Sequence, residues 1–269
     1  MNNMLIRIIV ALIAAPVILY SPFLGINYFA SFIFLISFLG SKELLNFYKA
    51  RHIKLNPLAP YLVSFIPLFF LAGGFEAAAE YSLAAALLLF TFEIFRAKDR
   101  VSYIISGYTL MIVYCGIFPA MLVGVISSTI PMMFIFIYGV IIATDSFAYF
   151  GGLTCRKLFR THKLIERISP KKTIEGSVSG LAFGILAGWL IFKYTEIGEG
   201  FTLAQAISFS AVISVLGQIG DLFESMIKRD FGVKDSSNII PGHGGVLDRF
   251  DSLIFVAPGA YIFIKYLLN

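Results

Sequence analysis

The feature that most constrains this chain is the recurrence of long apolar runs. Such runs occur nine times in 269 residues, at about 4–20, 23–40, 58–74, 77–95, 103–126, 130–152, 177–195, 201–225 and 253–268. Each approaches the roughly 20 residues that a helix needs to cross a hydrocarbon core about 30 Å thick. Only 14% of the residues are charged, against about 25% in soluble domains. The sequence therefore predicts an all-α, polytopic integral membrane protein with about nine transmembrane helices.

The basic residues are distributed unevenly among the connections between these runs. Of the 21 Lys and Arg residues, 19 fall at the N-terminus and in every second connection, and only Lys193 and Lys265 lie on the other face. Cytoplasmic connections carry an excess of Lys and Arg. We therefore expect a multi-pass protein of the cell (inner or plasma) membrane, with the N-terminus and a polar site facing the cytoplasm. Nucleic acid is not an expected partner, because the basic charge flanks spans rather than forming a separate basic module.

Two parts of the chain differ in character. The part at 1–126 has about five spans with short connections and is interpreted as a transmembrane scaffold. The part at 127–269 has about four spans and two long polar cytoplasmic connections, at 153–176 and 226–252. Long loops inside compact proteins are usually functional, so this part is predicted to be catalytic. Some polar residues outside it are expected to have no chemical role: Cys115 and Cys155 lack disulfide or zinc spacing, His52 and His162 are isolated, and Glu93 is expected to pair with Arg96.

A stripe of small residues begins the seventh apolar run, where Gly176, Gly180, Gly184 and Gly188 recur at every fourth position. Such a stripe is a packing surface between helices. Another span of the same chain is the favoured partner, and a second copy of the chain, in a homodimer, is the alternative.

Asp145 lies inside the apolar run at 132–150. Burying an isolated carboxylate in a membrane span costs about 2.5–3.5 kcal/mol even on the gentler scale, so it should face a polar cavity or a cation. Ala148, Tyr149 and Gly152 fall on the same helix face and leave room beside it. The alternative is an interfacial Asp in contact with headgroup water.

The segment at 169–176 reads Ser-Pro-Lys-Lys-Thr-Ile-Glu-Gly. Ser followed by Pro is typical of a helix N-cap and first turn, so a helix is predicted to begin at Ser169 and to direct its free amides at an anion. The alternative is that the lysines only anchor the following span. The substrate-binding candidates here are Ser169, Lys171, Lys172, Thr173 and Glu175.

The most polar part of the chain runs from the end of the eighth apolar run to the start of the ninth. Asp221, Glu224, Ser225 and Lys228 share one helix face by their spacing. Aspartates are hard oxygen ligands, Lys and Arg supply positive charge, and glycines let backbone amides approach a ligand, so the segment describes a site for a metal and phosphates. The candidates are, for catalysis, Asp221, Lys228, Arg229, Lys234, Asp235, His243, Asp248 and Arg249; for substrate binding, Gly244 and Gly245; and for metal binding, Asp221, Asp248, Asp145 and Asp251.

The segment at 225–251 resembles the signature of the phosphatidate cytidylyltransferase (CDP-diacylglycerol synthase) family. The shared elements are Ser-x-x-Lys-Arg, Lys-Asp, Pro-x-His-Gly-Gly and Asp-Arg-x-Asp, and the segments at 145–152 and 169–176 are similar to two upstream motifs of that family. The segment at 152–155 is less glycine-rich and basic than the family pattern. The resemblance implies a Mg²⁺-dependent nucleotidyltransferase of phospholipid biosynthesis. Its substrates would be CTP and phosphatidic acid, its products CDP-diacylglycerol and pyrophosphate, and its cofactor one or two Mg²⁺ ions.

Two other classes of protein fit less well. CDP-alcohol phosphotransferases also use several Asp residues at a membrane surface, but their motif opens with Asp-Gly, a dipeptide that this chain lacks. A transporter using Asp145 and Asp221 as cation sites would place polar groups towards both faces. Here they concentrate on the predicted cytoplasmic side.

Overall fold

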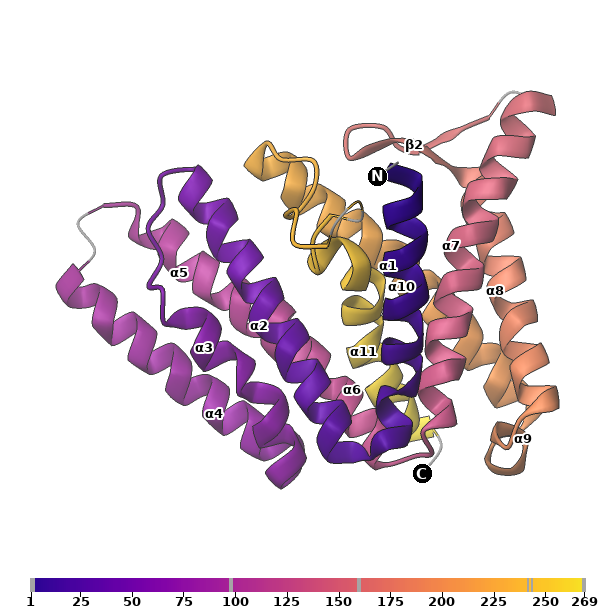
Figure 1. Cartoon of the computed structure of the whole chain (residues 1–269), viewed down its shortest axis with the longest axis horizontal. Helices are drawn as coiled ribbons and strands as arrows, with labels where there is room; N and C mark the ends of the chain where they lie inside the picture. Colours follow the sequence, from indigo (N-terminus) through magenta and orange to yellow (C-terminus); the bar gives the residue numbers. More distant parts are fainter. Residues whose placement is uncertain (1–2, 97–98, 159–160, 241, 243, 268–269) are drawn as a thin grey trace. The chain divides into compact units, whose positions relative to one another are not determined.

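The computed structural model describes residues 3–96, 99–158, 161–240, 242 and 244–267. The chain divides into two compact units (Figure 1). Unit 1 consists of residues 1–128 and 230–250, and unit 2 consists of residues 129–229 and 251–269. Within these described ranges both units are helical, as predicted for an all-α protein, except for one hairpin of two short strands in unit 2.

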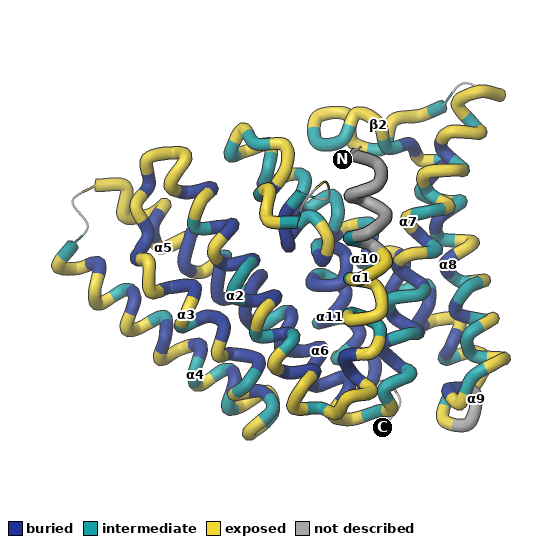
Figure 2. Tube along the Cα trace, viewed as in Figure 1, coloured by how far each residue is buried: buried dark blue, intermediate teal, exposed yellow. Residues whose placement is uncertain are grey.

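Unit 1 is a helical bundle in which α6 is largely buried, α2 is about half buried and α4 exposes much of its surface (Figure 2). The stretches α5, η2 and α6 form one continuous apolar helix, Val101–Ser127, with η2 as a π-helical insertion. The elements of unit 1 are α1 (Asn3–Tyr20), η1 (Ser21–Leu24), α2 (Ile26–Ala50), α3 (Ala59–Ser64), α4 (Ile66–Arg96), α5 (Val101–Leu110), η2 (Met111–Ile117) and α6 (Phe118–Ser127).

A break inside α4 separates the third and fourth predicted spans. Gly73 and Gly74 leave helical geometry, and Gly74 has a φ of +70°, which glycine adopts without steric cost. The chain then runs back along itself: the Phe69 and Tyr81 rings stack with centroids 4.0 Å apart, and the Tyr81 hydroxyl donates to the Leu62 carbonyl at 3.0 Å. The two apolar runs therefore fold back on each other at this break and form a helical hairpin.

Unit 2 is built around the pair of α7 and α8. Helices α10 and α11 lie mainly in this unit but each has one end in unit 1. Strands β1 and β2 form an antiparallel hairpin between α7 and α8, with Lys163 opposite Thr173 and Ile165 opposite Ser169. The elements of unit 2 are α7 (Met132–Leu158), β1 (Lys163–Ile165), β2 (Ser169–Thr173), α8 (Ile174–Tyr194), α9 (Ile197–Gly200), α10 (Leu203–Phe231) and α11 (Leu247–Leu267).

The glycine stripe on α8 packs against α7 and α10. A Cβ atom at Gly176 would lie 2.6 Å from the Ala148 carbonyl oxygen, and one at Gly180 would lie 2.7 Å from the Thr144 carbonyl oxygen. Further along the stripe, a Cβ at Gly184 or Gly188 would meet side chains of α7 and α10. The expectation that this stripe packs within the chain is confirmed. A second copy of the chain is therefore not required to cover this surface.

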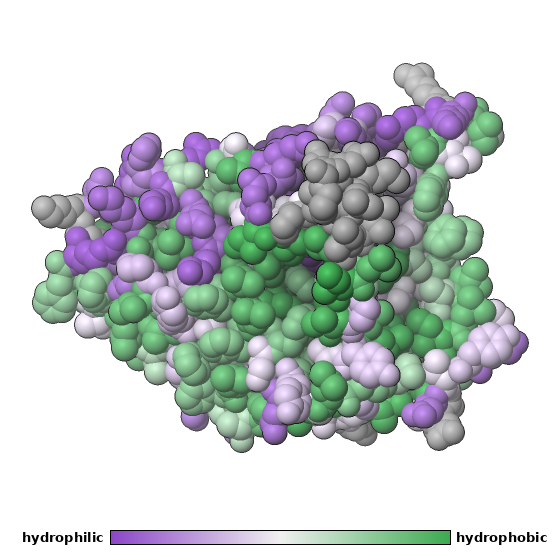
Figure 3. Space-filling model, viewed as in Figure 1, coloured by the Kyte–Doolittle hydropathy of each residue, from purple (hydrophilic) through white to green (hydrophobic). Residues whose placement is uncertain are grey.

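Six helices in the described part of the chain are long and apolar enough to cross a membrane: α2, α4, the continuous α5 to α6 helix, α7, α8 and α10. The predicted number of nine is not confirmed. The run at 58–74 forms α3 and the first turns of α4, and neither α1 nor α11 is among the six. On the face in Figure 3, hydrophilic side chains of unit 1 gather where α2 ends and α5 begins, and those of unit 2 gather over the hairpin, beyond the apolar sides of the helices.

Candidate functional site

A cavity of about 510 Å³ lies in unit 2 among α7, the hairpin, α8 and α10. The expectation that Asp145 faces a polar cavity is confirmed, since its exposed side chain lines this space together with Ala148, Tyr149 and Gly152. Both signs of charge meet in it. The charged lining residues are Asp145, Arg156, Lys171, Lys172 and Asp221.

The segment at 169–173 is a strand and not the first turn of a helix. Ser169 begins β2, and the N-cap of α8 is Thr173, whose hydroxyl accepts a hydrogen bond from the Gly176 amide at 3.1 Å. The prediction of a helix starting at Ser169 was therefore wrong. Pairing with β1 keeps the segment extended, and Thr173 supplies the side-chain acceptor that a helix start requires.

The hairpin brings Lys172 to α10, where its ammonium forms an ion pair with Asp221 Oδ2. The two side chains are only 28% and 34% exposed. Lys171 is exposed, and its carbonyl accepts a hydrogen bond from Arg156 Nη2 at 2.6 Å, which ties the strand to the end of α7. Lys172 is thus the lysine held against an acid, while the Lys171 side chain is exposed.

Glu175 stabilises the base of the hairpin. Its two carboxylate oxygens accept hydrogen bonds from the His162 amide at 3.0 and 3.2 Å, and Oε1 lies 2.8 Å from the His162 ring Nδ1. His162 has the structural role that was expected of it. The candidate role of Glu175 in substrate binding stays a prediction.

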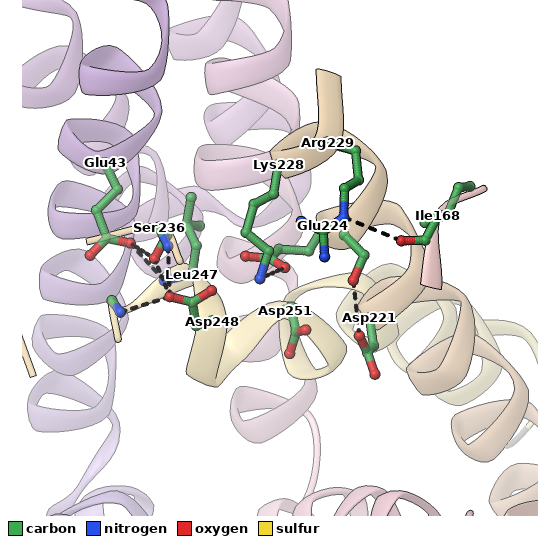
Figure 4. Close-up of polar contacts among 12 residues, drawn as sticks. Glu43, Ile168, Asp221, Glu224, Lys228, Arg229, Ser236, Leu247, Asp248 and Asp251 are labelled. Carbon is green, nitrogen blue, oxygen red and sulfur yellow. Dashed lines mark hydrogen bonds and ion pairs between the residues drawn. The ribbon is translucent and has the colours of Figure 1, made fainter. Parts of the chain in front are cut away.

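The predicted polar face of α10 is present. Lys228 Nζ lies 2.5 Å from Glu224 Oε2, with side chains only 13% and 3% exposed. The Ser225 hydroxyl donates to Asp221 Oδ1 at 3.4 Å, and Arg229 Nε donates to the Ile168 carbonyl at 3.4 Å, so α10 also holds the turn of the hairpin (Figure 4).

Three of the proposed metal ligands share one neighbourhood of unit 2. Asp145 and Asp251 each interact electrostatically with Asp221, and Asp251 also interacts with Lys228. Considered unit by unit, the described His, Cys, Asp and Glu residues include no three that are grouped closely enough to hold a metal ion. The ammonium of Lys172 contacts Asp221, so a cation already stands beside these acids. Hard carboxylate oxygens suit Mg²⁺, which completes its shell with water and substrate phosphate. The chemistry of Asp145, Asp221 and Asp251 therefore fits that ion, and the metal site stays a prediction.

Unit 1 contains a buried carboxylate that the sequence analysis did not identify. Glu43 on α2 is 0% exposed, and each of its oxygens accepts two hydrogen bonds from residues 236–237 and 246–247, which precede and begin α11 (Figure 4). Oε1 accepts from the Ser237 hydroxyl at 2.6 Å and the Val246 amide at 2.8 Å. Oε2 accepts from the Ser236 hydroxyl at 2.8 Å and the Leu247 amide at 2.9 Å.

Asp248 organises the same segment from its other side. Its Oδ2 accepts hydrogen bonds from the Ser236 amide, the Ser236 hydroxyl and the Gly245 amide, each at 2.8 Å. The glycines allow this close approach: Gly244 has a φ of +82°, and a Cβ at Gly245 would lie 2.6 Å from the carboxylate carbon of Glu43. Backbone amides do approach anionic groups here, as the glycines suggested, but these anions are carboxylates of the protein itself.

The remaining candidates divide between the units. Lys234, Asp235 and Arg249 are exposed in unit 1, and His243 lies outside the described residues. Asp248 also belongs to unit 1, whereas Asp221 belongs to unit 2. The proposed Asp221 and Asp248 ligand pair therefore takes one residue from each unit and stays a prediction.

A signal for Glu43 was present in the sequence. It falls on the same face of α2 as Ile36, Gly40 and Phe47, all buried, and a charged residue on an apolar helix face requires a polar partner. No local pattern names that partner, because it lies about 200 residues later in the chain.

Comparison with known proteins identifies the family of the chain. Residues 5–267 match the model of the Cytidylyltransferase family. The chain is 33% identical over 263 residues to the phosphatidate cytidylyltransferase of Staphylococcus saprophyticus, covering 95% of this chain and 96% of the relative. It is 33% identical over 273 residues to that of Bacillus subtilis, covering 98% of each. The chain therefore belongs to the cytidylyltransferase family, together with these phosphatidate cytidylyltransferases.

Proposed function

We infer that the chain is a phosphatidate cytidylyltransferase of phospholipid biosynthesis. It transfers a cytidylyl group from CTP to phosphatidic acid and yields CDP-diacylglycerol and pyrophosphate. The main support for this function is that the chain is 33% identical, over nearly its whole length, to relatives named phosphatidate cytidylyltransferase. The cavity of unit 2, which presents two lysines and an arginine beside two aspartates, suits phosphate groups and a cation.

The reaction is a displacement at phosphorus. A phosphate oxygen of the lipid attacks the α-phosphorus of CTP, a new P–O bond forms, and the bond from the α-phosphorus to the oxygen bridging to the β-phosphate breaks. A phosphomonoester has a second pKa of about 6 and is largely dianionic at neutral pH, so the nucleophile needs no strong general base. The main obstacle is repulsion between two anionic substrates, which cationic groups must offset.

The basic residues of the cavity are proposed to carry that role. Lys172 is positioned by its ion pair with Asp221, and Arg156 holds the strand that carries Lys171. When phosphate enters, Lys172 can exchange part of its contact with Asp221 for a phosphate oxygen. Lys228, Arg229, Lys234 and Arg249 are the further candidates for the lipid phosphate and the triphosphate.

Mg²⁺ is proposed as the cofactor, with Asp221 and Asp248 as principal ligands and Asp145 and Asp251 as further candidates. When bound, the ion would neutralise phosphate charge and stabilise the leaving pyrophosphate. The release of Asp221 from Lys172 would free that carboxylate for the ion. One or two ions are compatible with four carboxylates.

We place the polar site at the cytoplasmic face of the cell membrane, with nine spans in total. The support is the 19 to 2 division of basic residues between the two sets of connections. In this arrangement the acyl chains stay in the bilayer while the headgroup enters the cavity, and CTP arrives from the cytoplasm.

One assay tests the proposed activity. Purified protein in detergent is given phosphatidic acid, Mg²⁺ and each of the four ribonucleoside triphosphates in turn, and release of pyrophosphate is measured. We expect release with CTP only, together with formation of CDP-diacylglycerol. Release at the same rate with UTP or ATP would contradict the cytidylyl assignment.

A further inference from the structure

We propose that Glu43 is a positioning residue of this enzyme. It holds the two ends of the segment at 236–247, namely residues 236–237 and 246–247, on α2, and through Ser236 it controls where the carboxylate of Asp248 is presented. The proposal rests on the function inferred above. Helix α2 belongs to the part of the chain interpreted as scaffold. Through Glu43 and Ser236, this helix would influence Asp248, a proposed ligand of the metal.

Among the residues that the structure describes, the hydrogen bonds to Glu43 all come from this one segment. Two are donated by side-chain hydroxyls and two by backbone amides, and the distances lie between 2.6 and 2.9 Å. A buried charge is costly unless it is paired or fully hydrogen-bonded, and a carboxylate has two acceptor oxygens that can satisfy four donors. Glu43 and the segment therefore stabilise each other, and the side chain cannot leave without exposing at least the amides of Val246 and Leu247 and the hydroxyl of Ser237.

Ser236 links Glu43 to Asp248. Its hydroxyl oxygen lies 2.8 Å from Glu43 Oε2 and 2.8 Å from Asp248 Oδ2. A hydroxyl has one hydrogen to donate, so the two carboxylates compete for it. Any change at Glu43 alters the hydrogen bond that Asp248 receives, which couples a residue buried on α2 to the negative charge available to a metal.

The substitution Glu43→Gln tests the anchoring because it preserves the shape of the side chain but removes one of its two acceptor oxygens. One oxygen becomes an NH₂ group, which is a donor and accepts nothing. In either orientation of the side-chain amide, the backbone N–H of Val246 or of Leu247 then meets a donor. Backbone amides cannot reverse their role, so at least one of these two hydrogen bonds is lost.

Glu93 supplies a matched control. It is also buried in unit 1, at 4% exposure. Its Oε1 accepts from Arg96 at 2.6 Å and from Tyr108 at 2.5 Å, which confirms the expected ion pair and joins α4 to α5. Glu93→Gln therefore removes a buried carboxylate of the same unit whose partners belong to these helices and not to the segment at 236–247.

The first measurement is hydrogen exchange by mass spectrometry on the purified protein in detergent, without metal or substrate. We expect peptides containing Val246 and Leu247 to exchange about tenfold faster in Glu43→Gln, since the loss of a hydrogen bond to a charged group is worth at least a factor of ten. Glu93→Gln should leave these peptides unchanged. Unchanged exchange in Glu43→Gln would overturn the proposed anchoring.

The second measurement is the Mg²⁺ concentration at half-maximal rate. A purely structural defect lowers the amount of active enzyme and hence the maximal rate, but it does not move this midpoint. We expect the midpoint to rise several-fold in Glu43→Gln and in the milder Ser236→Ala, and to stay constant in Glu93→Gln. A constant midpoint in Ser236→Ala, together with a constant midpoint in any active Glu43→Gln protein, would overturn the positioning role.

The hydrogen-exchange and Mg²⁺ measurements together distinguish failure of this inference from failure of the proposed function. Should the wild-type protein release no pyrophosphate from CTP and phosphatidic acid, the function is wrong, and the exchange measurement still decides whether Glu43 anchors the segment. Should Glu43→Gln fail to fold, Ser236→Ala and Ser237→Ala, which each remove one donor to Glu43, decide both measurements.

Discussion

Lys172 on β2 and Asp221 on α10 form an ion pair at the wall of the cavity in unit 2. The pair joins a basic strand to the acidic face of a long helix, and both side chains remain about one-third exposed. An ion pair that is partly open to solvent contributes only modestly to stability. Asp221 also interacts electrostatically with Asp145. In the proposed function, the pair would hold a lysine proposed to bind phosphate and an acid proposed to bind Mg²⁺ in position before substrate enters.

The two lysines of β2 are predicted to serve substrate binding rather than anchoring. Replacement of both Lys171 and Lys172 by Gln should lower kcat/KM at least tenfold, because each charge-assisted hydrogen bond to phosphate is worth about 1.5–3 kcal/mol. Membrane insertion and thermal stability in detergent should change little. Arg167→Gln, an exposed change in the turn of the same hairpin, is the control and should be nearly neutral. Normal turnover in the double variant would favour the anchoring role.

Asp221→Asn and Asp248→Asn should both abolish most activity but should differ in stability. We expect each rate to fall by at least about 100-fold at limiting Mg²⁺, as is common when a charge-stabilising group is removed. Asp221→Asn should melt like the wild type, because its carboxylate is partly exposed. Asp248→Asn should lose about 1–3 kcal/mol, since its carboxylate accepts three hydrogen bonds in the segment before α11.

Activity assays over a range of Mg²⁺ and Mn²⁺, with thermal unfolding in detergent, check this pair of variants. Partial rescue at high metal concentration is expected for Asp221→Asn. Retention of most of the wild-type rate by both variants at limiting Mg²⁺ would show that the ligands are wrong. The site would then have to be rebuilt around Asp145 and Asp251.

The glycine stripe predicts a packing defect on substitution. Gly180→Val should destabilise the protein by about 1–3 kcal/mol, the usual cost of overpacking, because even a Cβ atom would lie 2.7 Å from the Thr144 carbonyl oxygen. Val178→Leu, two residues away on a side chain that is 61% exposed, should change stability by no more than about 0.5 kcal/mol. Equal melting temperatures for the two variants would show that α7 and α8 are not tightly packed.

The nine-span topology predicts that the two ends of the chain lie on opposite sides of the membrane. In a variant with Cys155 replaced by Ser, a cysteine added after Leu268 should react with an impermeant reagent in intact cells. A cysteine at Glu166, in the exposed turn of the hairpin, should react only after lysis. Labelling of both positions only after lysis would exclude nine spans with an external C-terminus.

Much of the fold and one part of the site follow from local sequence alone. A long apolar run must form a helix in a bilayer because its backbone groups find no other partners there, so α2, α7, α8 and α10 were predictable. The same physics requires a polar environment for Asp145, and a cavity is present beside it. The stripe at Gly176 to Gly188 likewise predicted close helix packing, because small residues at every fourth position leave one face smooth.

Only the tertiary structure decided which distant groups the polar residues contact, whereas the local pair of Glu93 and Arg96 was predictable. Pairing with β1 turned the segment at Ser169 into a strand and transferred the helix cap to Thr173, against the local Ser-Pro signal. The role of Glu43 depended on four donors about 200 residues away. Periodicity shows which face of a helix is buried, but a hydrogen bond between distant segments is selected by the packing of the whole unit. For that reason the long apolar helices α2, α7, α8 and α10 could be predicted from the sequence, and the anchoring of the polar segment could not.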